Sequence, residues 1–170
     1  MAPPPDAEVL AAQRGDRAAF ARLFARWHRV VHAVLLARLP AQDAEDLVQE
    51  VFVTAWLRMG ELTEPRAFGG WLCAVARNRA TDLGRARRPT EPLIDEPAAP
   101  AADPLGTQDV LRAVHGLPLA YRETLLLRLV EGYTGPEIAV ATGMTEGSVR
   151  VNLHRGMALL RERLTAMGVA

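Results

Sequence analysis

The chain has 170 residues, of which 49% are hydrophobic and 5% aromatic, so it can hold one ordinary domain or two small ones with cores of leucine, valine and alanine. Its single cysteine, Cys73, excludes an internal disulfide and a multi-cysteine metal site. No apolar run reaches the length of a membrane span, and MAPPPDAEVL lacks the basic flank and apolar core of a secretion signal. These features predict a soluble, cytoplasmic protein.

The net charge of zero hides a segregation of charge along the chain. Residues 1–88 contain 13 arginines and 10 acids, and residues 110–170 contain seven arginines and five acids. Residues 89–109 contain five acids and no arginine. Two mildly basic segments are therefore joined by an acidic one, and this asymmetry says more about partners than the total does. All 20 basic residues are arginines, which together with the alanine and proline content indicates a GC-rich, bacterial genome.

The first segment shows helical spacing of apolar residues and no convincing strand. Asp16 can cap a first helix that Pro40 ends, and a second helix covers residues 43–59. Pro65 suits the first turn of a third helix, which is expected to extend to about Leu83 and to stop at Gly84. We expect these helices to pack as one bundle.

Residues 89–108 contain five prolines and no amphipathic period, so the sequence predicts a flexible, acidic, proline-rich linker over 89–109. Helical spacing resumes with Asp109 as the cap of a short helix that Gly116 ends, and Pro118 opens the next one. The predicted fold class is all-α. Two small helical domains, residues 1–88 and 110–170, are expected on either side of the linker.

A helix-turn-helix pattern follows in the second domain. Thr134 and Glu137 form a capping-box pair, Gly143 suits a turn with positive φ, and Thr145 can cap a long last helix. A short helix, a turn of about three residues and a second helix that enters the major groove are typical of DNA-reading proteins.

The last helix has an outward face whose side chains suit a DNA groove. Arginine can fork onto guanine, asparagine can pair with adenine, and valine can contact a thymine methyl group. The candidate DNA-contacting residues here are Ser148, Arg150, Val151, Asn152, His154 and Arg155. The alternative is a small helical bundle whose arginines are merely solvated.

Residues 77–88 form a basic stretch with five arginines and one aspartate. Such a patch attracts a phosphate backbone, although a solvated helix end would look the same. Helical phase places Arg79 on the core side, which favours a structural ion pair. His28 and His32 are four residues apart, but no acid or cysteine motif accompanies them, so we expect no metal and no cofactor.

The helix over 43–59 carries apolar residues on both of its faces. One face is a regular core stripe, and the other mixes acidic or amide groups with apolar side chains. That mixture beside a basic patch predicts a surface that binds a protein partner. The residues of this predicted surface are Asp46, Leu47, Gln49, Glu50, Val53 and Leu57.

Two stretches of the chain resemble a known family. DAEDLVQEVFVTAW followed by FGGWLCAVARNRATDLGRARR resembles conserved region 2 of the extracytoplasmic-function (ECF) group of sigma-70-type sigma factors. LPLAYRETLLLRLVEGYTGPEIAVATGMTEGSVRVNLHRGMALLRERL resembles their region 4. The adjacent glycines in FGGW replace residues that are often larger in the family, which predicts an unusually bare local surface.

The resemblance implies a dissociable promoter-specificity subunit of bacterial RNA polymerase. The mixed surface of the 43–59 helix would bind the clamp of the largest subunit of core RNA polymerase. The C-terminal domain would read the −35 element of promoter DNA, and the acidic linker would pass through polymerase near the template path. An anti-sigma factor would hold the protein inactive. The −10 element would be captured from residue 60 onward and recognised by Arg77, Asn78, Thr81, Arg85, Arg87 and Arg88.

The sequence also bears on other classes of function. The sequence shows no phosphate-cradling loop, no paired catalytic carboxylates and no nucleophile–base set, so we expect no enzyme. A conventional helix-turn-helix regulator, whose N-terminal bundle dimerises or senses a ligand, is the main alternative, and a helical adaptor that binds only proteins is a weaker one. A conventional regulator requires neither the basic stretch over 77–88 nor the acidic linker.

Overall fold

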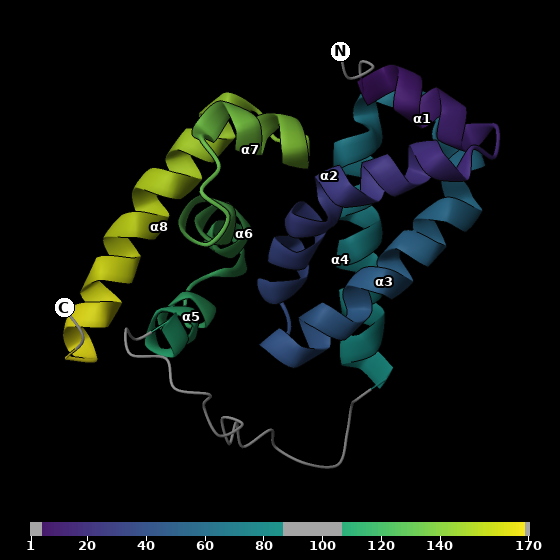
Figure 1. Ribbon diagram of the computed structural model, residues 1–170. Coiled ribbons are helices and arrows are strands. Elements are labelled where there is room, and N and C mark those ends of the chain that lie inside the picture. Colours follow the sequence, from purple (N-terminus) through teal and green to yellow (C-terminus); the bar gives the residue numbers. More distant parts are fainter. Residues whose placement is uncertain (1–4, 87–106, 169–170) are drawn as a thin grey trace.

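The computed structural model describes residues 5–86 and 107–168, and within these ranges every regular element is helical (Figure 1). The all-α fold class and the two small helical domains are therefore confirmed. The N-terminal domain consists of α1 (Pro5–Gln13), α2 (Arg17–Leu36), α3 (Ala41–Arg58), the 3₁₀ turns η1 (Met59–Glu61) and η2 (Pro65–Ala67), and α4 (Phe68–Ala86). The C-terminal domain consists of α5 (Thr107–His115), α6 (Leu119–Leu129), α7 (Gly135–Thr142) and α8 (Glu146–Ala166).

Local sequence signals account for several of these boundaries. The Asp16 carboxylate accepts hydrogen bonds from the amides of Ala18 at 2.9 Å and Ala19 at 3.0 Å, as the cap at the start of α2. The side chains of Thr134 and Glu137 form the predicted capping box before α7. Gly143 ends α7 in the left-handed conformation with φ 73°, which only glycine adopts without strain.

Several features differ from the predicted boundaries, and Pro65 opens the 3₁₀ turn η2 whereas α4 itself begins at Phe68. Helix α4 continues through Gly84 to Ala86, because Gly84 does not adopt a positive φ and so does not stop the helix. Helix α5 begins at Thr107, inside the range predicted as linker, and residues 87–106 lie outside the described part of the chain. Helix α1 was not predicted. It is fixed in part by Gln13, whose Nε2 donates to the backbone oxygens of Met59 and Leu62 at 2.9 and 2.7 Å.

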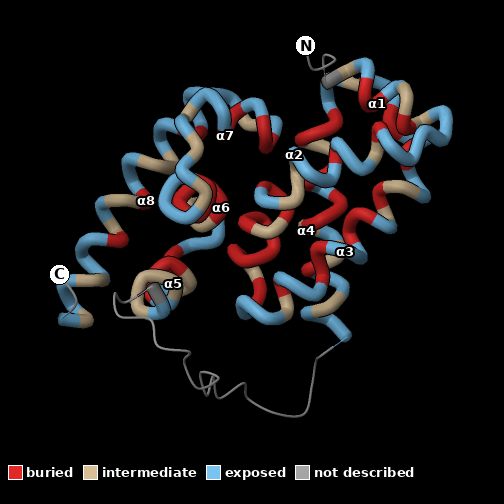
Figure 2. The backbone as a smooth tube through the Cα atoms, viewed as in Figure 1, coloured by how far each residue is buried: buried red, intermediate tan, exposed pale blue. Residues whose placement is uncertain are grey.

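The two domains pack directly against each other. Helices α2 and α4 face α6 and α7, and buried positions concentrate where α2 and α6 approach each other (Figure 2). Polar contacts cross this boundary. Arg122 Nη1 donates to the Ala37 carbonyl at 3.2 Å, and an ion pair joins Arg29 Nε to Glu131 Oε2 at 2.5 Å. The structure therefore shows a closed arrangement of the two domains.

Candidate partner and nucleic-acid interfaces

The outward side of α3 presents apolar side chains among acidic ones. Leu57 is 77% exposed and Val53 is 59% exposed, and Asp46, Gln49 and Glu50 are exposed around them. The core stripe on the other side is buried as its helical phase predicts: Ala44, Val48, Val51, Phe52, Ala55 and Met59. Two large apolar groups that stay in water on a helix with a complete core face are typical of a protein interface.

Leu47 differs from the prediction that placed it on this exposed surface. It is only 5% exposed and belongs to the core. It lies one helical turn before the fully buried Val51, and with Leu83 of α4 it lines the groove between α3 and α4. Leu47, which lies between the core face and the outward face of α3, is therefore covered by α4 and contributes to the packing of α3 against α4.

An ion pair joins α3 to α4 at the edge of the same surface. Arg79 Nη2 lies 2.5 Å from Glu50 Oε2, as expected for an arginine on the core side of its helix. The Glu50 side chain remains 59% exposed. Its carboxylate can therefore brace α4 while part of it stays available to a partner.

The outer face of α4 carries a row of polar and basic side chains. Arg77, Thr81 and Arg85 follow one another at four-residue intervals, so they share one side of the helix. Asn78, Thr81 and Arg85 are exposed, and Thr81 Oγ1 donates to the Arg77 carbonyl at 2.9 Å. The remaining predicted contacts, Arg87 and Arg88, lie outside the described residues.

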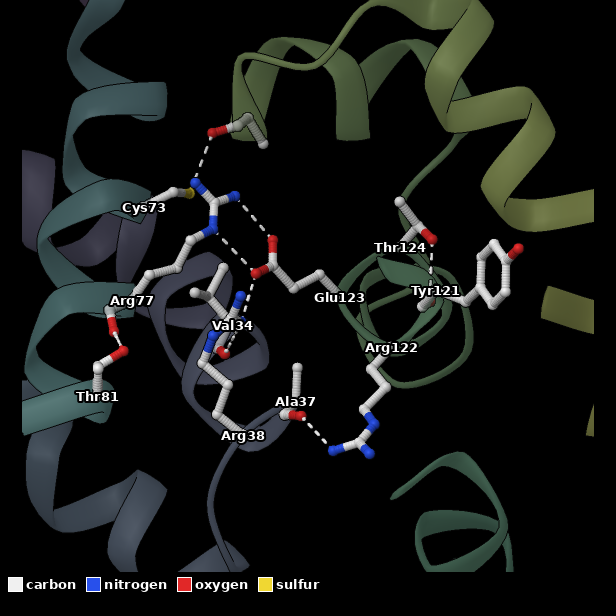
Figure 3. Close-up of polar contacts among 11 residues, drawn as sticks. Val34, Ala37, Arg38, Cys73, Arg77, Thr81, Tyr121, Arg122, Glu123 and Thr124 are labelled. Carbon is white, nitrogen blue, oxygen red and sulfur yellow. Dashed lines mark hydrogen bonds and ion pairs between the residues drawn. The ribbon is translucent and has the colours of Figure 1, made fainter. Parts of the chain in front are cut away.

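Arg77 points toward the other domain (Figure 3). Its Nε and Nη2 atoms donate to the two carboxylate oxygens of Glu123 in α6 at 2.9 and 2.8 Å, a bidentate pair. Arg38, just beyond the end of α2, forms an ion pair with the same carboxylate. Neither Arg38 nor Glu123 was singled out from the sequence. Glu123 could have been, because it is in helical phase with the buried Leu126 and Leu127.

The electrostatics around Glu123 and Arg77 favour the charged forms of both side chains. Burial of Glu123, which is only 3% exposed, raises the pKa of its carboxyl group. The hydrogen bonds and positive charges of Arg77 and Arg38 outweigh that effect, so the net pKa of Glu123 is lowered. The hydrogen bonds that Arg77 donates to Glu123 likewise raise the pKa of Arg77. The Glu123 carboxylate and the Arg77 guanidinium group are therefore charged at neutral pH.

Two glycines allow α4 and the helix-turn-helix to approach closely. A Cβ atom added at Gly70 would lie 3.4 Å from the Cα of Gly143, so these two backbones are in contact. Beside them, Cys73 Sγ donates to the Ala141 carbonyl at 3.6 Å. Burial raises the pKa of Cys73 to about 12, which keeps the thiol protonated and unreactive in the closed arrangement. Gly69 and Gly70, the glycines of FGGW that predicted a bare surface, lie against the other domain here.

The helix-turn-helix has its predicted geometry, with Ile138 and Val149 both buried where α7 meets α8. Thr145 Oγ1 accepts from the Ser148 amide at 3.1 Å and caps α8. The outward face of α8 remains open: Val151 is 44% exposed, Asn152 is half-buried, and the exposed members are Ser148, Arg150, His154 and Arg155. The described residues contain no group of three or more metal-ligating side chains and no helix long and apolar enough to cross a bilayer.

Comparison with known proteins gives a consistent result. Residues 23–90 match the family Sigma-70 region 2, and residues 107–160 match Sigma-70, region 4. The ECF RNA polymerase sigma factor SigM of Mycobacterium tuberculosis is 36% identical over 94% of this chain and 84% of its own length. The probable RNA polymerase sigma factor RfaY of Xanthomonas campestris is 32% identical over 92% of this chain and 43% of its own length, so the chain spans less than half of that relative.

A solved structure agrees with both the sequence and the fold. CnrH of Cupriavidus metallidurans, in complex with the cytosolic domain of CnrY, superposes with a TM-score of 0.68 and 28% identity. The match covers 95% of this chain and 97% of that one. The exposed face of α8, the mixed surface of α3 and the order of the two matched regions all fit one family. The chain belongs to the ECF group of sigma-70-type RNA polymerase sigma factors.

Proposed function

We propose that this protein binds core RNA polymerase through the outward surface of α3 and directs transcription from promoters that carry both a −10 and a −35 element. The single observation that carries this proposal is the presence, in one chain, of an exposed helix-turn-helix and a separate apolar–acidic helix surface. A DNA reader alone needs only the first. A subunit that brings polymerase to a promoter needs both.

The α3 surface supports the polymerase contact energetically. Leu57 and Val53 are mostly exposed, and full burial of such a side chain contributes about 1.5–3 kcal/mol. Burying both would therefore supply several kcal/mol at the centre of an interface. Asp46, Gln49 and Glu50 around them would pair with basic groups of the partner and set its orientation. The partner of that chemistry, by family membership, is the clamp of the largest polymerase subunit.

The two DNA contacts would use different chemistry. The exposed face of α8, with Arg150, Asn152 and Arg155, would read the −35 element as duplex DNA in the major groove. The row on α4 that includes Asn78, Thr81 and Arg85 would contact the −10 element as its strands separate. Capture of an extruded base offsets part of the cost of unpairing, which is a few kcal/mol for each base.

Control by an anti-sigma factor fits the same surfaces. The relative CnrH forms a complex with the cytosolic domain of CnrY, and an inhibitor of this chain would cover the α3 surface and the face of α8. A pull-down with the full chain as bait tests this expectation. Recovery of polymerase without any small inhibitor, under conditions in which the regulon is silent, would contradict it.

In vitro transcription tests the proposed function. The full chain is added to core polymerase and fragmented genomic DNA from its host, and the start sites of the run-off transcripts are sequenced. We expect start sites preceded by two shared elements, and we expect scrambling of either element to abolish initiation because the two domains bind as a bivalent pair. Strong initiation from a promoter with a scrambled −35 element would refute the bivalent reading. No initiation from any fragment would refute the function.

A further inference from the structure

Glu123 is held between arginines from two elements of the opposite domain (Figure 3). It is 3% exposed, whereas the side chains of Arg38 and Arg77 are 17% and 29% exposed. Removing a carboxylate from water is costly, and a buried ion pair is weak grounds for a purely stabilising role. The arrangement instead resembles an anion site formed by one domain and filled by the other.

The two guanidinium groups form a fork that suits an oxyanion. Arg77 grips both oxygens of the carboxylate, and arginine binds phosphate oxygens with the same bidentate geometry. Arg38 contacts the carboxylate oxygen Oε1 that Arg77 Nε also contacts, and its Nη1 donates to the Val34 carbonyl at 3.1 Å, which fixes its direction. A cleft of about 470 Å³, lined in part by Arg38, Arg77 and Glu123, gives access to the fork from solvent.

Separation of the domains would leave this fork without an anion. Arg77 has no other carboxylate partner among the described residues, and Arg38 would keep only its backbone acceptor. Two neighbouring positive charges without a counter-ion attract an anion strongly. The exposed Thr81 and Arg85 extend from Arg77 along the same side of α4. A ligand with several regularly spaced negative charges fits this row better than a single carboxylate does, and the phosphate backbone of DNA has that character.

We propose that Arg38 and Arg77 form one phosphate-binding site for promoter DNA, and that Glu123 occupies this site when the two domains are closed. This inference rests on the proposed DNA-binding function and adds a regulatory property to it. One site cannot hold both anions, so domain closure and DNA binding by α4 compete. The closed chain is then a self-masked form in which Glu123 takes the place of a DNA phosphate.

Anisotropy titrations with a fluorescein-labelled single-stranded 20-mer of mixed sequence test the competition. Glu123→Gln keeps the shape of the side chain and removes its charge. Glu162→Gln is the matched control, because it makes the same change in net charge at an exposed position of α8 in the same domain. We expect Glu123→Gln to bind the oligonucleotide about ten-fold more tightly than the wild type, since the affinity of a masked site is reduced by the fraction of open molecules. The control should differ from the wild type by less than about three-fold.

A triple variant identifies the site of the gain. Adding Arg38→Gln and Arg77→Gln to Glu123→Gln should return the affinity to that of the wild type or below it. Equal affinities of Glu123→Gln and Glu162→Gln would overturn the proposal, and so would a gain that survives loss of both arginines. The run-off assay reports on the proposed function separately. A chain that initiates transcription but fails these comparisons loses the masking inference and keeps its function.

The wild-type chain provides a second measurement that needs no variant. Cys73 is fully buried beside the Ala141 carbonyl of the other domain, so its reaction with a maleimide reports domain opening. Pyrophosphate is small enough to fill the Arg38–Arg77 fork without covering the thiol. We expect it to speed labelling several-fold relative to sodium chloride at equal ionic strength. Equal labelling rates in the two salts would overturn the proposal even if Glu123→Gln does not fold.

Discussion

Adjacent glycines at the start of α4 face very different surroundings. A Cβ added at Gly69 would lie 2.5 and 2.7 Å from Cη2 and Cζ3 of Trp27, and 2.8 Å from the Ala141 carbonyl oxygen of the other domain. A Cβ added at Gly70 would meet nothing closer than 3.4 Å, an ordinary van der Waals distance. Gly69→Ala should therefore force Trp27 and α7 to shift, and Gly70→Ala should not.

The expected difference in stability follows from two opposing effects. Both substitutions favour the helix by up to about 1 kcal/mol, and this gain cancels when the two variants are compared. Overpacking of a filled interior costs about 1–3 kcal/mol, and only Gly69→Ala incurs it. We expect the free energy of unfolding of Gly69→Ala to be about 1–3 kcal/mol lower than that of Gly70→Ala.

Urea unfolding, followed by far-UV circular dichroism and by tryptophan fluorescence, measures this difference. The fluorescence of Gly69→Ala should also change in the native state, because the Trp27 ring must move. Gly70→Ala serves as the matched control, with the same added methyl group one residue away. A Gly69→Ala variant as stable as Gly70→Ala, with an unchanged native spectrum, would refute the close approach of α2, α4 and α7 described above.

Three further predictions concern individual contacts. Asp16→Ala removes the N-cap of α2 and should lower the free energy of unfolding by about 1 kcal/mol, whereas Asp16→Asn should retain most of it, as measured by urea titration. Gln13→Ala removes the two hydrogen bonds to the Met59 and Leu62 carbonyls and should lower the free energy of unfolding by about 1–3 kcal/mol in the same assay. An unchanged free energy of unfolding would show that α1 does not brace the η1 turn. Acid should open the domains, because the pKa of Glu123 is lowered in the closed state: closure is stabilised above the ordinary glutamate pKa and lost as the pH falls through the lowered value. The radius of gyration from X-ray scattering should therefore rise in strong acid for the wild type, and this step should be absent from Glu123→Gln.

Features set by neighbouring residues in the sequence were predictable. The capping box at Thr134, the left-handed Gly143 and the cap at Thr145 depend on a few adjacent residues, and the structure shows all three. Helix α1 was missed because its position depends on contacts with η1, more than 40 residues away, through Gln13. Local pattern alone carries no information about such a contact.

Features set by contact between helices or domains were harder to predict. Leu47 lies at the border between the core face and the outward face of α3, and its burial depends on the position of α4. Arg77 does lie on the outer face of its own domain, but the sequence does not show that Glu123 covers it. The burial of Cys73 has the same cause, since its cover includes the Ala141 carbonyl of the second domain.

The most direct test of the account is co-migration of the chain with core RNA polymerase on size exclusion. The double variant Asp46→Arg/Leu57→Arg reverses one charge and adds another on the exposed surface of α3 without touching the core. Leu10→Arg, at an exposed leucine of α1 in the same domain, is the control. We predict that the double variant stays folded and elutes apart from polymerase, while the control still co-migrates. Full co-migration of the double variant would contradict the assignment of α3 as the polymerase-binding surface.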